Sequence, residues 1–488
     1  MTRTDTSRRG HWIDDWRPED PEFWENGGKQ VARRNLIWSI FAEHLGFSVW
    51  LIWSVSSAFL LQMGFAFTPQ QLFLLVALPN LVGSLLRLPY TFAVPKFGGR
   101  NWTMISAALL LVPTLLFAVA VQDPGTPYWV FCVIAATAGF GGGNFASSMA
   151  NINFFYPASK KGAALGLNAA GGNAGVAIIQ LLLPVIVGGA GIFGLVKASG
   201  GGIHLQTAGF VYAGLAILAT IAAYLWMDNL SSAKSNPREQ LAVVRKPHTW
   251  IMAFLYIGTF GSFIGYSAAM PLLIKLNFWV PEPAPLGTGI YFAYFAFLGA
   301  GIGSLTRPFG GWLADKYGGA KVTLAAFTGM VVFTLAVLVT LTRLTPNPTA
   351  DPAIATDNQA LFPWFLGFFL LIFASTGIGN GSTYKMIPAI WRREAETTTE
   401  AGTPERAAAL ATATKQSSAA LGIIGAVGAL GGFLIPIAFS SPWVDDPLAA
   451  TKGAFVVFTC FYVVCALVTF AVYLRQPARA RALATAGV

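Results

Sequence analysis

The stretch "RLPYTFAVPKFGGR" (residues 87–100) decides the fold, because it returns later in the chain as "RPFGGWLADKYGGA" (residues 307–320). Each copy begins with an arginine, and a lysine, an aromatic residue and two glycines follow near its end in the same order. The surroundings of the copies correspond too, through Trp38 with Trp250, Gly139, Gly141 and Gly143 with Gly377, Gly379 and Gly381, and Gly172 and Gly175 with Gly422 and Gly425. We therefore predict a chain of two repeated halves.

The composition places these halves in a membrane. The chain has 488 residues, of which 55% are hydrophobic and only 11% charged, whereas a soluble protein carries roughly 25% charged residues. Twelve apolar segments reach the about 20 residues that a bilayer-spanning helix needs, at approximately 36–62, 70–93, 102–121, 128–155, 162–190, 206–227, 249–276, 288–314, 321–342, 361–390, 407–438 and 452–474. We predict an all-α polytopic membrane protein with twelve transmembrane helices in two pseudo-twofold six-helix halves.

Polar segments divide the chain around these spans. The first 35 residues lack the apolar core of a signal peptide, so we expect the first span to remain uncleaved. The predicted divisions are an N-terminal tail (1–35), a first half (36–227), a charged linker (228–248), a second half (249–474) and a C-terminal tail (475–488).

Lysine and arginine predict the orientation of the chain. They are concentrated in the N-terminal tail, in every second loop and in the C-terminal tail, and such an excess marks the cytoplasmic side. We therefore expect a multi-pass protein of the cytoplasmic (plasma) membrane with both termini in the cytoplasm. This topology also accounts for the net charge of +10, so we expect no nucleic-acid partner.

Arg87 and Arg307 lie at equivalent places inside apolar spans. An arginine at the centre of a membrane costs about 2.5–3.5 kcal/mol on insertion scales. Either arginine could be held by a buried ion pair, but the neighbouring stretches contain no Asp or Glu. Two like charges that face one pseudo-twofold axis repel each other unless an anion joins them, which favours an anion-binding site between the halves.

Four glycine-rich segments form the second signal: 139–155, 166–180, 377–382 and 422–433. Small residues three or four positions apart allow helices to pack closely, and this packing is one interpretation of the pattern. Packing does not require the amides of Asn144, Asn151, Asn173 and Gln180, which add neutral hydrogen-bond donors around a narrow cavity.

At these residues the chain resembles a known family, the NarK-type nitrate/nitrite porters of the major facilitator superfamily. The resemblance extends over nearly the whole length. It is carried by "DWRPEDPEFW" (15–24), "RNL" (34–36), "LLRLPYTFAVPKFGGRNWT" (85–103), "GNFASSMANINFFYP" (143–157), "ALGLNAAGGNAGVAIIQ" (164–180), "TFGSFIGYSA" (259–268) and "AALGIIGAVGALGGFLIP" (419–436). The glycine-rich helices look like the nitrate signature of that family, and "GWLADKYGGAK" (311–321) looks like the loop motif of the superfamily.

The resemblance implies that a nitrate ion is sandwiched between the two arginines. The residues that it implies for the site are Arg87 and Arg307, the donors Asn173 and Tyr256, the walls Phe145 and Phe260, and Gly172 and Gly425 of the signature helices. The chemistry agrees, since a planar guanidinium can meet two oxygens of a planar anion at once.

The chain departs from antiporting members of that family in four charged or titratable residues of its spans, namely Glu43, His44, Lys385 and Lys415. A carboxylate beside a histidine suits a proton relay. The alternative is that Glu43 forms an ion pair with Lys385 or Lys415 and only fixes helix contacts.

We therefore expect a monomeric secondary transporter that imports nitrate with protons by alternating access. Nitrate/nitrite exchange is the alternative within this class, and a transporter-like nitrate sensor is a distant one. The spans contain no metal-ligand cluster, Cys–His pair or carboxylate dyad, so we expect no enzyme, no cofactor and no metal. The expected partners are nitrate, nitrite, protons and the lipid bilayer.

Overall fold

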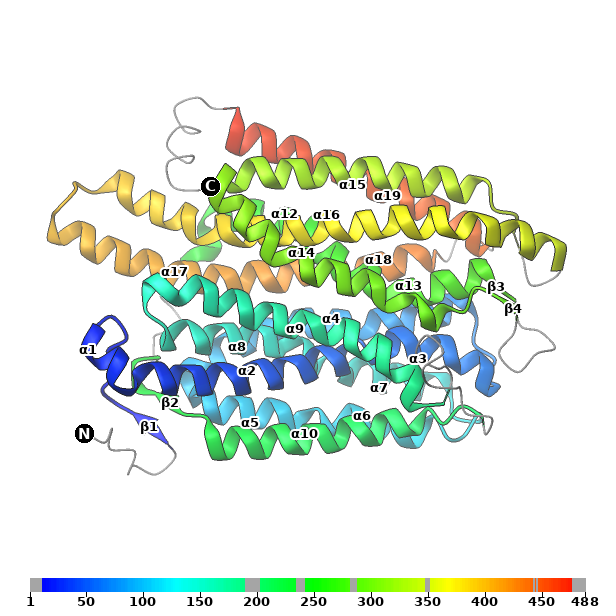
Figure 1. Ribbon diagram of the computed structural model, residues 1–488, viewed down its shortest axis with the longest axis horizontal. Coiled ribbons are helices and arrows are strands. Elements are labelled where there is room, and N and C mark those ends of the chain that lie inside the picture. The colour runs from blue at the N-terminus through cyan, green and yellow to red at the C-terminus, as the bar shows by residue number, and fades with distance from the viewer. Residues whose placement is uncertain are drawn as a thin grey trace.

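The computed structural model describes residues 11–188, 202–233, 242–280, 288–346, 352–441, 444 and 446–475. Long helices run side by side along the longest axis of the molecule (Figure 1). Two small sheets accompany them: β1 (Trp12–Ile13) pairs in parallel with β2 (Asn229–Leu230), and β3 (Trp279–Val280) pairs antiparallel with β4 (Thr288–Gly289).

The N-terminal half contains six membrane-length helical units, and in three of them a single residue separates two consecutive helices. A short entrance of α1 (Pro21–Phe23) and η1 (Trp24–Gly28) precedes them. The units are α2 (Lys29–Trp50) with α3 (Ile52–Leu60) and η2 (Leu61–Met63), α4 (Pro69–Phe97), α5 (Gly99–Leu109) with α6 (Leu111–Ala120), α7 (Tyr128–Ala138) with α8 (Phe140–Phe155), α9 (Ala158–Ile186) and α10 (Gln206–Trp226).

The C-terminal half repeats this arrangement. It is preceded by the short helices η3 (Ser231–Ala233) and η4 (Ala242–Arg245), and η6 (Phe292–Tyr294) leads into its second unit. The units are α12 (Pro247–Tyr256) with the π-helical η5 (Ile257–Gly261) and α13 (Ser262–Phe278), α14 (Ala296–Tyr317), α15 (Gly319–Thr342), α16 (Pro352–Thr398), α17 (Pro404–Ala429) with α18 (Gly431–Phe439), and α19 (Pro447–Thr469) with η7 (Phe470–Leu474).

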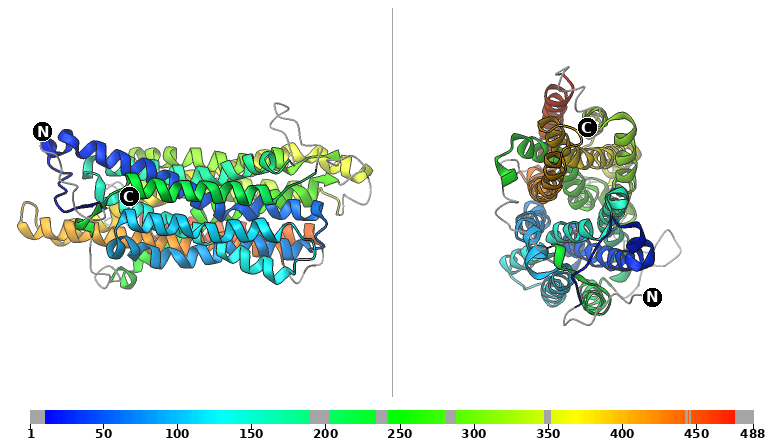
Figure 2. Two further views of the ribbon diagram at one scale, coloured as in Figure 1. Left: turned by 90° about the horizontal axis from the view of Figure 1, so that it is seen from below. Right: turned by 90° about the vertical axis from the view of Figure 1, so that its left-hand side faces the viewer.

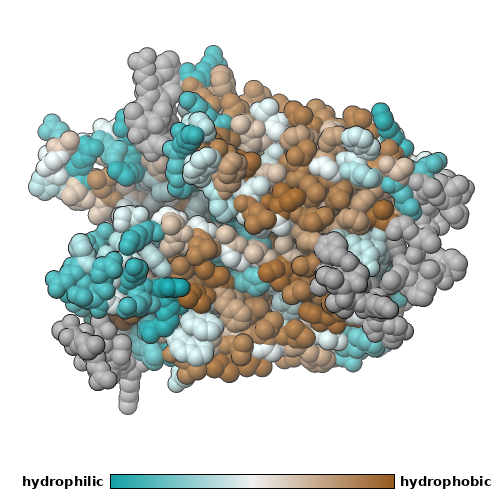
Figure 3. All heavy atoms as spheres, in the orientation of Figure 1, coloured by the Kyte–Doolittle hydropathy of each residue, from teal (hydrophilic) through white to brown (hydrophobic). Residues whose placement is uncertain are grey.

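The predicted twelve spans correspond to these twelve units. Among the described residues, eleven helices are long and apolar enough to cross a membrane. The twelfth unit, α14, has 22 residues and so spans about 33 Å, but its glycines and Arg307 lower its hydropathy. The prediction that this span begins at residue 288 was wrong, because residues 288–289 form β4 and the helix begins only at Ala296. On the face shown in Figure 3, hydrophobic residues form a broad belt across the middle of the molecule.

The two copies of the repeated motif fold alike. Gly98 and Gly318 end α4 and α14 with φ angles of 87° and 91°, which favour glycine. Their backbone N–H groups donate to the carbonyl oxygens of Val94 and Ala314, each at 2.9 Å. An end-on view shows the two halves as adjacent bundles, the blue-to-green N-terminal one below the green-to-red C-terminal one (Figure 2). The arrangement confirms the all-α fold of two six-helix halves.

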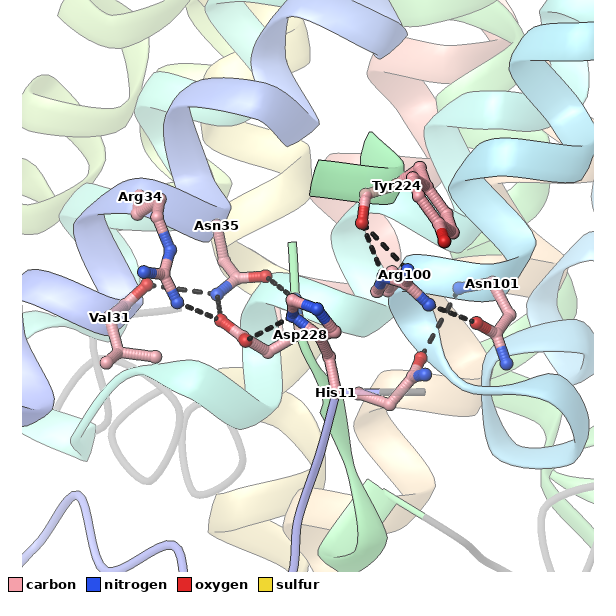
Figure 4. A network of polar contacts seen from close by, with 9 residues as sticks. His11, Val31, Arg34, Asn35, Arg100, Asn101, Tyr224 and Asp228 are labelled. Carbon is pink, nitrogen blue, oxygen red and sulfur yellow. Dashed lines mark hydrogen bonds and ion pairs between the residues drawn. The ribbon is translucent and has the colours of Figure 1, made fainter. Parts of the chain in front are cut away.

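β1 and the end of α19 lie at the same end of the molecule, which we name the β1 end (Figure 1). A polar network fixes the N-terminal half there (Figure 4). The buried carboxylate of Asp228 accepts hydrogen bonds from Arg34 at 2.6 Å and Asn35 at 2.8 Å, and His11 lies 3.7 Å from it. The start of α2 is thereby tied to the end of α10. The first ten residues of the predicted tail, residues 234–241 of the linker and residues 476–488 lie outside the described residues.

Candidate anion-binding site

Arg87 lies on α4 with its side chain fully buried. Its Nε donates to the carbonyl oxygen of Gly142 on α8, and its Nη1 donates to that of Gly425 on α17, both at 3.0 Å. Its Nη2 is buried and has no hydrogen-bond partner in the described part of the chain. The hydrogen bonds of Nε and Nη1 therefore fix the guanidinium group, and Nη2 remains available to donate to a ligand.

Arg307 lies on α14 and is 5% exposed. Both Nη1 and Nη2 are buried without a partner among the described residues. Neither Arg307 nor Arg87 forms an ion pair with a residue that the structure describes. The structure thus gives no support to the alternative of a structural ion pair, and unpaired buried charge of this kind is what a bound anion would neutralise.

Aromatic rings surround the two guanidinium groups. The ring of Phe145 lies 4.8 Å from Cζ of Arg87 and 5.6 Å from Cζ of Arg307. Phe260 lies 4.8 Å from Cζ of Arg87 and stacks on Phe145 with a centroid distance of 6.1 Å. Since Phe145 comes from the N-terminal half and Phe260 from the C-terminal half, the structure places both predicted wall residues at the seam between the halves.

Two tyrosines complete the polar lining. Tyr256 stacks on Phe260 at 5.3 Å, and Tyr384 on α16 lies 5.3 Å from Cζ of Arg307. The hydroxyl groups of both are buried and lack partners in the part of the chain that the structure describes. Sequence reasoning found Tyr256 through the family resemblance and missed Tyr384, although its place just after the glycine-rich 377–382 segment was a usable signal.

Cavities connect the arginines to the β1 end. A cavity of about 840 Å³ is lined by Arg307 and Tyr384, and its wall also carries Lys161 and Arg392. A much smaller pocket of about 30 Å³ lies beside Arg87, and Tyr384 lines it as well. The cavity therefore offers a positively charged route between the site and one face of the protein.

The opposite end is closed by contacts between the halves. Gln180 donates to the carbonyl oxygen of Ser267 at 2.6 Å, and the ammonium of Lys275 donates to that of Ala58. The rings of Phe59 and Phe292 meet with a centroid distance of 5.1 Å. The structure thus shows one state of a two-half protein, joined at one end and hollow at the other.

Of the two predicted site glycines, Gly425 lies beside Arg87, whereas Gly172 lies beside Glu43. A Cβ added to Gly425 would lie 3.7 Å from Nη1 of Arg87, whereas one added to Gly172 would overlap Oε1 of Glu43. Asn173 is fully buried, and neither of its side-chain polar atoms has a partner in the described chain. Asn173 and Gly172 do not line the two cavities, so their part in substrate binding stays a prediction.

Glu43 is buried inside the N-terminal half. Its Oε2 accepts a hydrogen bond from Asn168 at 2.8 Å, and Asn168 also donates to Ser148 at 2.6 Å. Its Oε1 is buried without a described partner. The neighbouring His44 points elsewhere, with Nδ1 3.1 Å from the carbonyl oxygen of Gly171. Glu43 does not line either of the two cavities.

The alternative, an ion pair of Glu43 with Lys385 or Lys415, is wrong for this structure. Lys385 pairs instead with Asp315 at 2.6 Å on the cavity wall, and Lys415 is exposed. The physical reason is position: Glu43 lies in the interior of its own half, among α2, α8 and α9, while both lysines belong to the C-terminal half.

Comparisons with known proteins identify the family of the chain. Residues 44–422 match the model of the Major Facilitator Superfamily. The chain is 41% identical to "Nitrate/nitrite transporter NarU" of Escherichia coli (strain K12), over 95% of this chain and 96% of that protein. It is 39% identical to "Probable nitrate/nitrite antiporter NarK2" of Thermus thermophilus, over 79% of this chain and 84% of that protein.

Solved structures support the same fold. The inward open conformation of the xylose transporter XylE from E. coli matches with a TM-score of 0.60 at 13% identity, over 92% of this chain and 98% of that one. The relatives are transporters rather than enzymes. The chain therefore belongs to the nitrate/nitrite transporter family of the major facilitator superfamily.

Proposed function

We propose that the protein transports nitrate, with nitrite as a second substrate, through a site between Arg87 and Arg307. The observation that carries this proposal is that three buried guanidinium nitrogens of Arg87 and Arg307, at equivalent positions of the two halves, have no hydrogen-bond partner among the described residues. Nitrate is planar and weakly hydrated, and guanidinium groups match its oxygens with parallel N–H donors. The relatives whose names contain nitrate and nitrite support the same substrates.

Transport proceeds by alternating access. The seam is joined at one end, near Gln180 and Ser267, and hollow at the other, where Arg307 and Tyr384 line the large cavity. Rocking of one half against the other around a fixed central site would open the joined end and close the hollow end. With both termini in the cytoplasm and the protein in the cytoplasmic membrane, as the distribution of Lys and Arg predicts, the cavity faces inward.

The direction is import coupled to protons, and Glu43 is the residue that couples them. Moving one negative charge into a cell at about −100 mV costs roughly 2.3 kcal/mol, and a proton carried along removes this cost. Glu43 is a buried carboxylate, and its Oε1 has no hydrogen-bond partner in the described structure. Exchange of nitrate for nitrite, the activity in the name of the Thermus relative, needs no such residue and is the alternative.

Nitrate uptake into proteoliposomes tests both the substrate and the coupling to protons. Uptake driven by an acidic outer pH, without nitrite inside, is the result expected for proton symport. Uptake that requires internal nitrite and ignores the pH gradient would establish exchange. Absence of nitrate movement under both conditions would contradict the substrate assignment itself.

A further inference from the structure

We propose that Tyr384 is a specificity-determining residue whose hydroxyl group binds the anion and makes the site prefer nitrate to nitrite. This inference rests on the proposed function, since it assumes that both anions bind between Arg87 and Arg307. It assigns a role to a side chain that the sequence did not single out.

Tyr384 occupies the junction between the two parts of the site. It lines both the small pocket beside Arg87 and the large cavity beside Arg307. Its ring lies 5.3 Å from Cζ of Arg307, and its centroid is 6.4 Å from that of Phe145. An anion that passes between the cavity and the pocket therefore passes this ring.

The hydroxyl group of Tyr384 has no hydrogen-bond partner within the described part of the chain. It is buried and makes no hydrogen bond, although most buried tyrosine hydroxyl groups find a partner. The hydroxyl group of the other tyrosine of the site, Tyr256, also lacks a partner among the described residues, but Tyr256 is fully buried, stacks on Phe260 and lines neither cavity. Of the two, only the half-buried Tyr384 borders the space through which an anion would enter.

The chemistry of the two anions turns this donor into a discriminator. Nitrate has three oxygen atoms and nitrite has two. When the guanidinium groups of Arg87 and Arg307 engage two oxygens, nitrate presents a third to a further donor, while nitrite leaves that donor unpaired. The hydroxyl group is already without a partner among the described residues before any anion binds. It therefore adds a hydrogen bond to nitrate and leaves the affinity for nitrite as it is, so the site prefers nitrate.

Binding of nitrate and nitrite, each measured by calorimetry on the purified full-length protein, tests the proposal. Tyr384→Phe keeps the ring and removes only the hydroxyl group. We expect nitrate to bind about 2- to 10-fold more weakly, as for loss of one neutral hydrogen bond, while the affinity for nitrite stays the same. The matched control is Tyr212→Phe, a buried tyrosine of α10 that lines neither cavity; it should change neither affinity.

Equal weakening of both anions, or no change in either, would overturn the role in discrimination while leaving the nitrate site intact. Wild-type protein that binds neither anion would contradict the proposed function and, with it, this inference. The melting temperature of Tyr384→Phe, measured without anion, separates a lost contact to the anion from a damaged fold. We expect it to be unchanged, because this hydroxyl group makes no hydrogen bond with the described residues.

Discussion

Nη1 of Arg87 donates a hydrogen bond to the carbonyl oxygen of Gly425, 3.0 Å away, and so joins the two halves of the chain at the proposed anion-binding site. Arg87 belongs to α4 and Gly425 to α17, so the bond crosses the seam along which the halves would rock. The same guanidinium keeps its Nη2 free of described partners. A residue that contacts both the opposite half and the anion is suited to link binding with the movement of the halves.

Gly425 should tolerate a methyl group but not a larger side chain. A Cβ at this position meets Nη1 of Arg87 at an ordinary contact distance of 3.7 Å. The larger leucine side chain extends beyond this Cβ and would compete with the guanidinium group of Arg87 for the small adjoining pocket. We expect Gly425→Ala to bind nitrate with little change and Gly425→Leu to lose binding while it remains in the membrane. Nitrate calorimetry checks this, and full affinity in the leucine variant would show that position 425 lies away from the anion.

Gly172 should be sensitive even to alanine. A Cβ there would overlap Oε1 of Glu43, so the carboxylate must move. We expect Gly172→Ala to lower the rate of pH-driven nitrate uptake in proteoliposomes. Gly166→Ala, on the same helix but with open space around the new methyl group, is the matched control and should keep the wild-type rate. Equal rates in both variants would show that the position of Glu43 does not matter for uptake.

Replacement of Glu43 by glutamine tests coupling directly. Glutamine has nearly the same volume, and its side-chain oxygen can still accept the hydrogen bond from Asn168, now at 2.8 Å, but it cannot carry a proton. We expect Glu43→Gln to abolish accumulation driven by a pH gradient while nitrate counterflow persists. Glu25→Gln, at an exposed position, should behave as wild type. Accumulation that persists in Glu43→Gln would make this carboxylate structural and favour exchange.

Lys385 should contribute little to coupling, because it pairs with Asp315 rather than with Glu43. We expect Lys385→Ala to keep the response of nitrate uptake to an imposed pH gradient, and the same holds for exposed Lys415→Ala. The pH-driven accumulation of nitrate in proteoliposomes is the measurement. Loss of that response in Lys385→Ala alone would indicate that Lys385 reaches Glu43 in another state of the cycle.

Much of the fold could be predicted from sequence because two signals are local. The repeated "FGG" and "YGG" endings gave the two halves, and they form the same left-handed glycine turn at Gly98 and Gly318. The length of the apolar segments predicted the transmembrane spans. Hydropathy marks the bilayer rather than the ends of helices, so it placed the tenth span at 361–390 while α16 continues from Pro352 to Thr398.

The site was predictable where charge stood out against an apolar background, as it does for Arg87 and Arg307. Tyr384 was missed because an aromatic residue at helical spacing resembles ordinary core. The partner of Lys385 was mistaken for a different reason: pairing depends on which helices meet, and the contact between α14 and α16 that brings Asp315 to Lys385 cannot be read from spacing along the chain.

The dissociation constant of nitrate in a double-mutant cycle of Arg87→Lys and Arg307→Lys tests most directly whether one nitrate ion contacts both arginines. Lysine keeps the charge but loses the planar fork, so each single variant should bind nitrate roughly 10- to 100-fold more weakly, as for loss of a hydrogen bond to a charged group. Arg343→Lys, at an exposed position, is the control for the substitution itself. If one ion bridges both residues, the double variant should lose clearly less than the product of the two single losses. Losses that multiply, or a single variant with wild-type affinity, would contradict a nitrate held between Arg87 and Arg307.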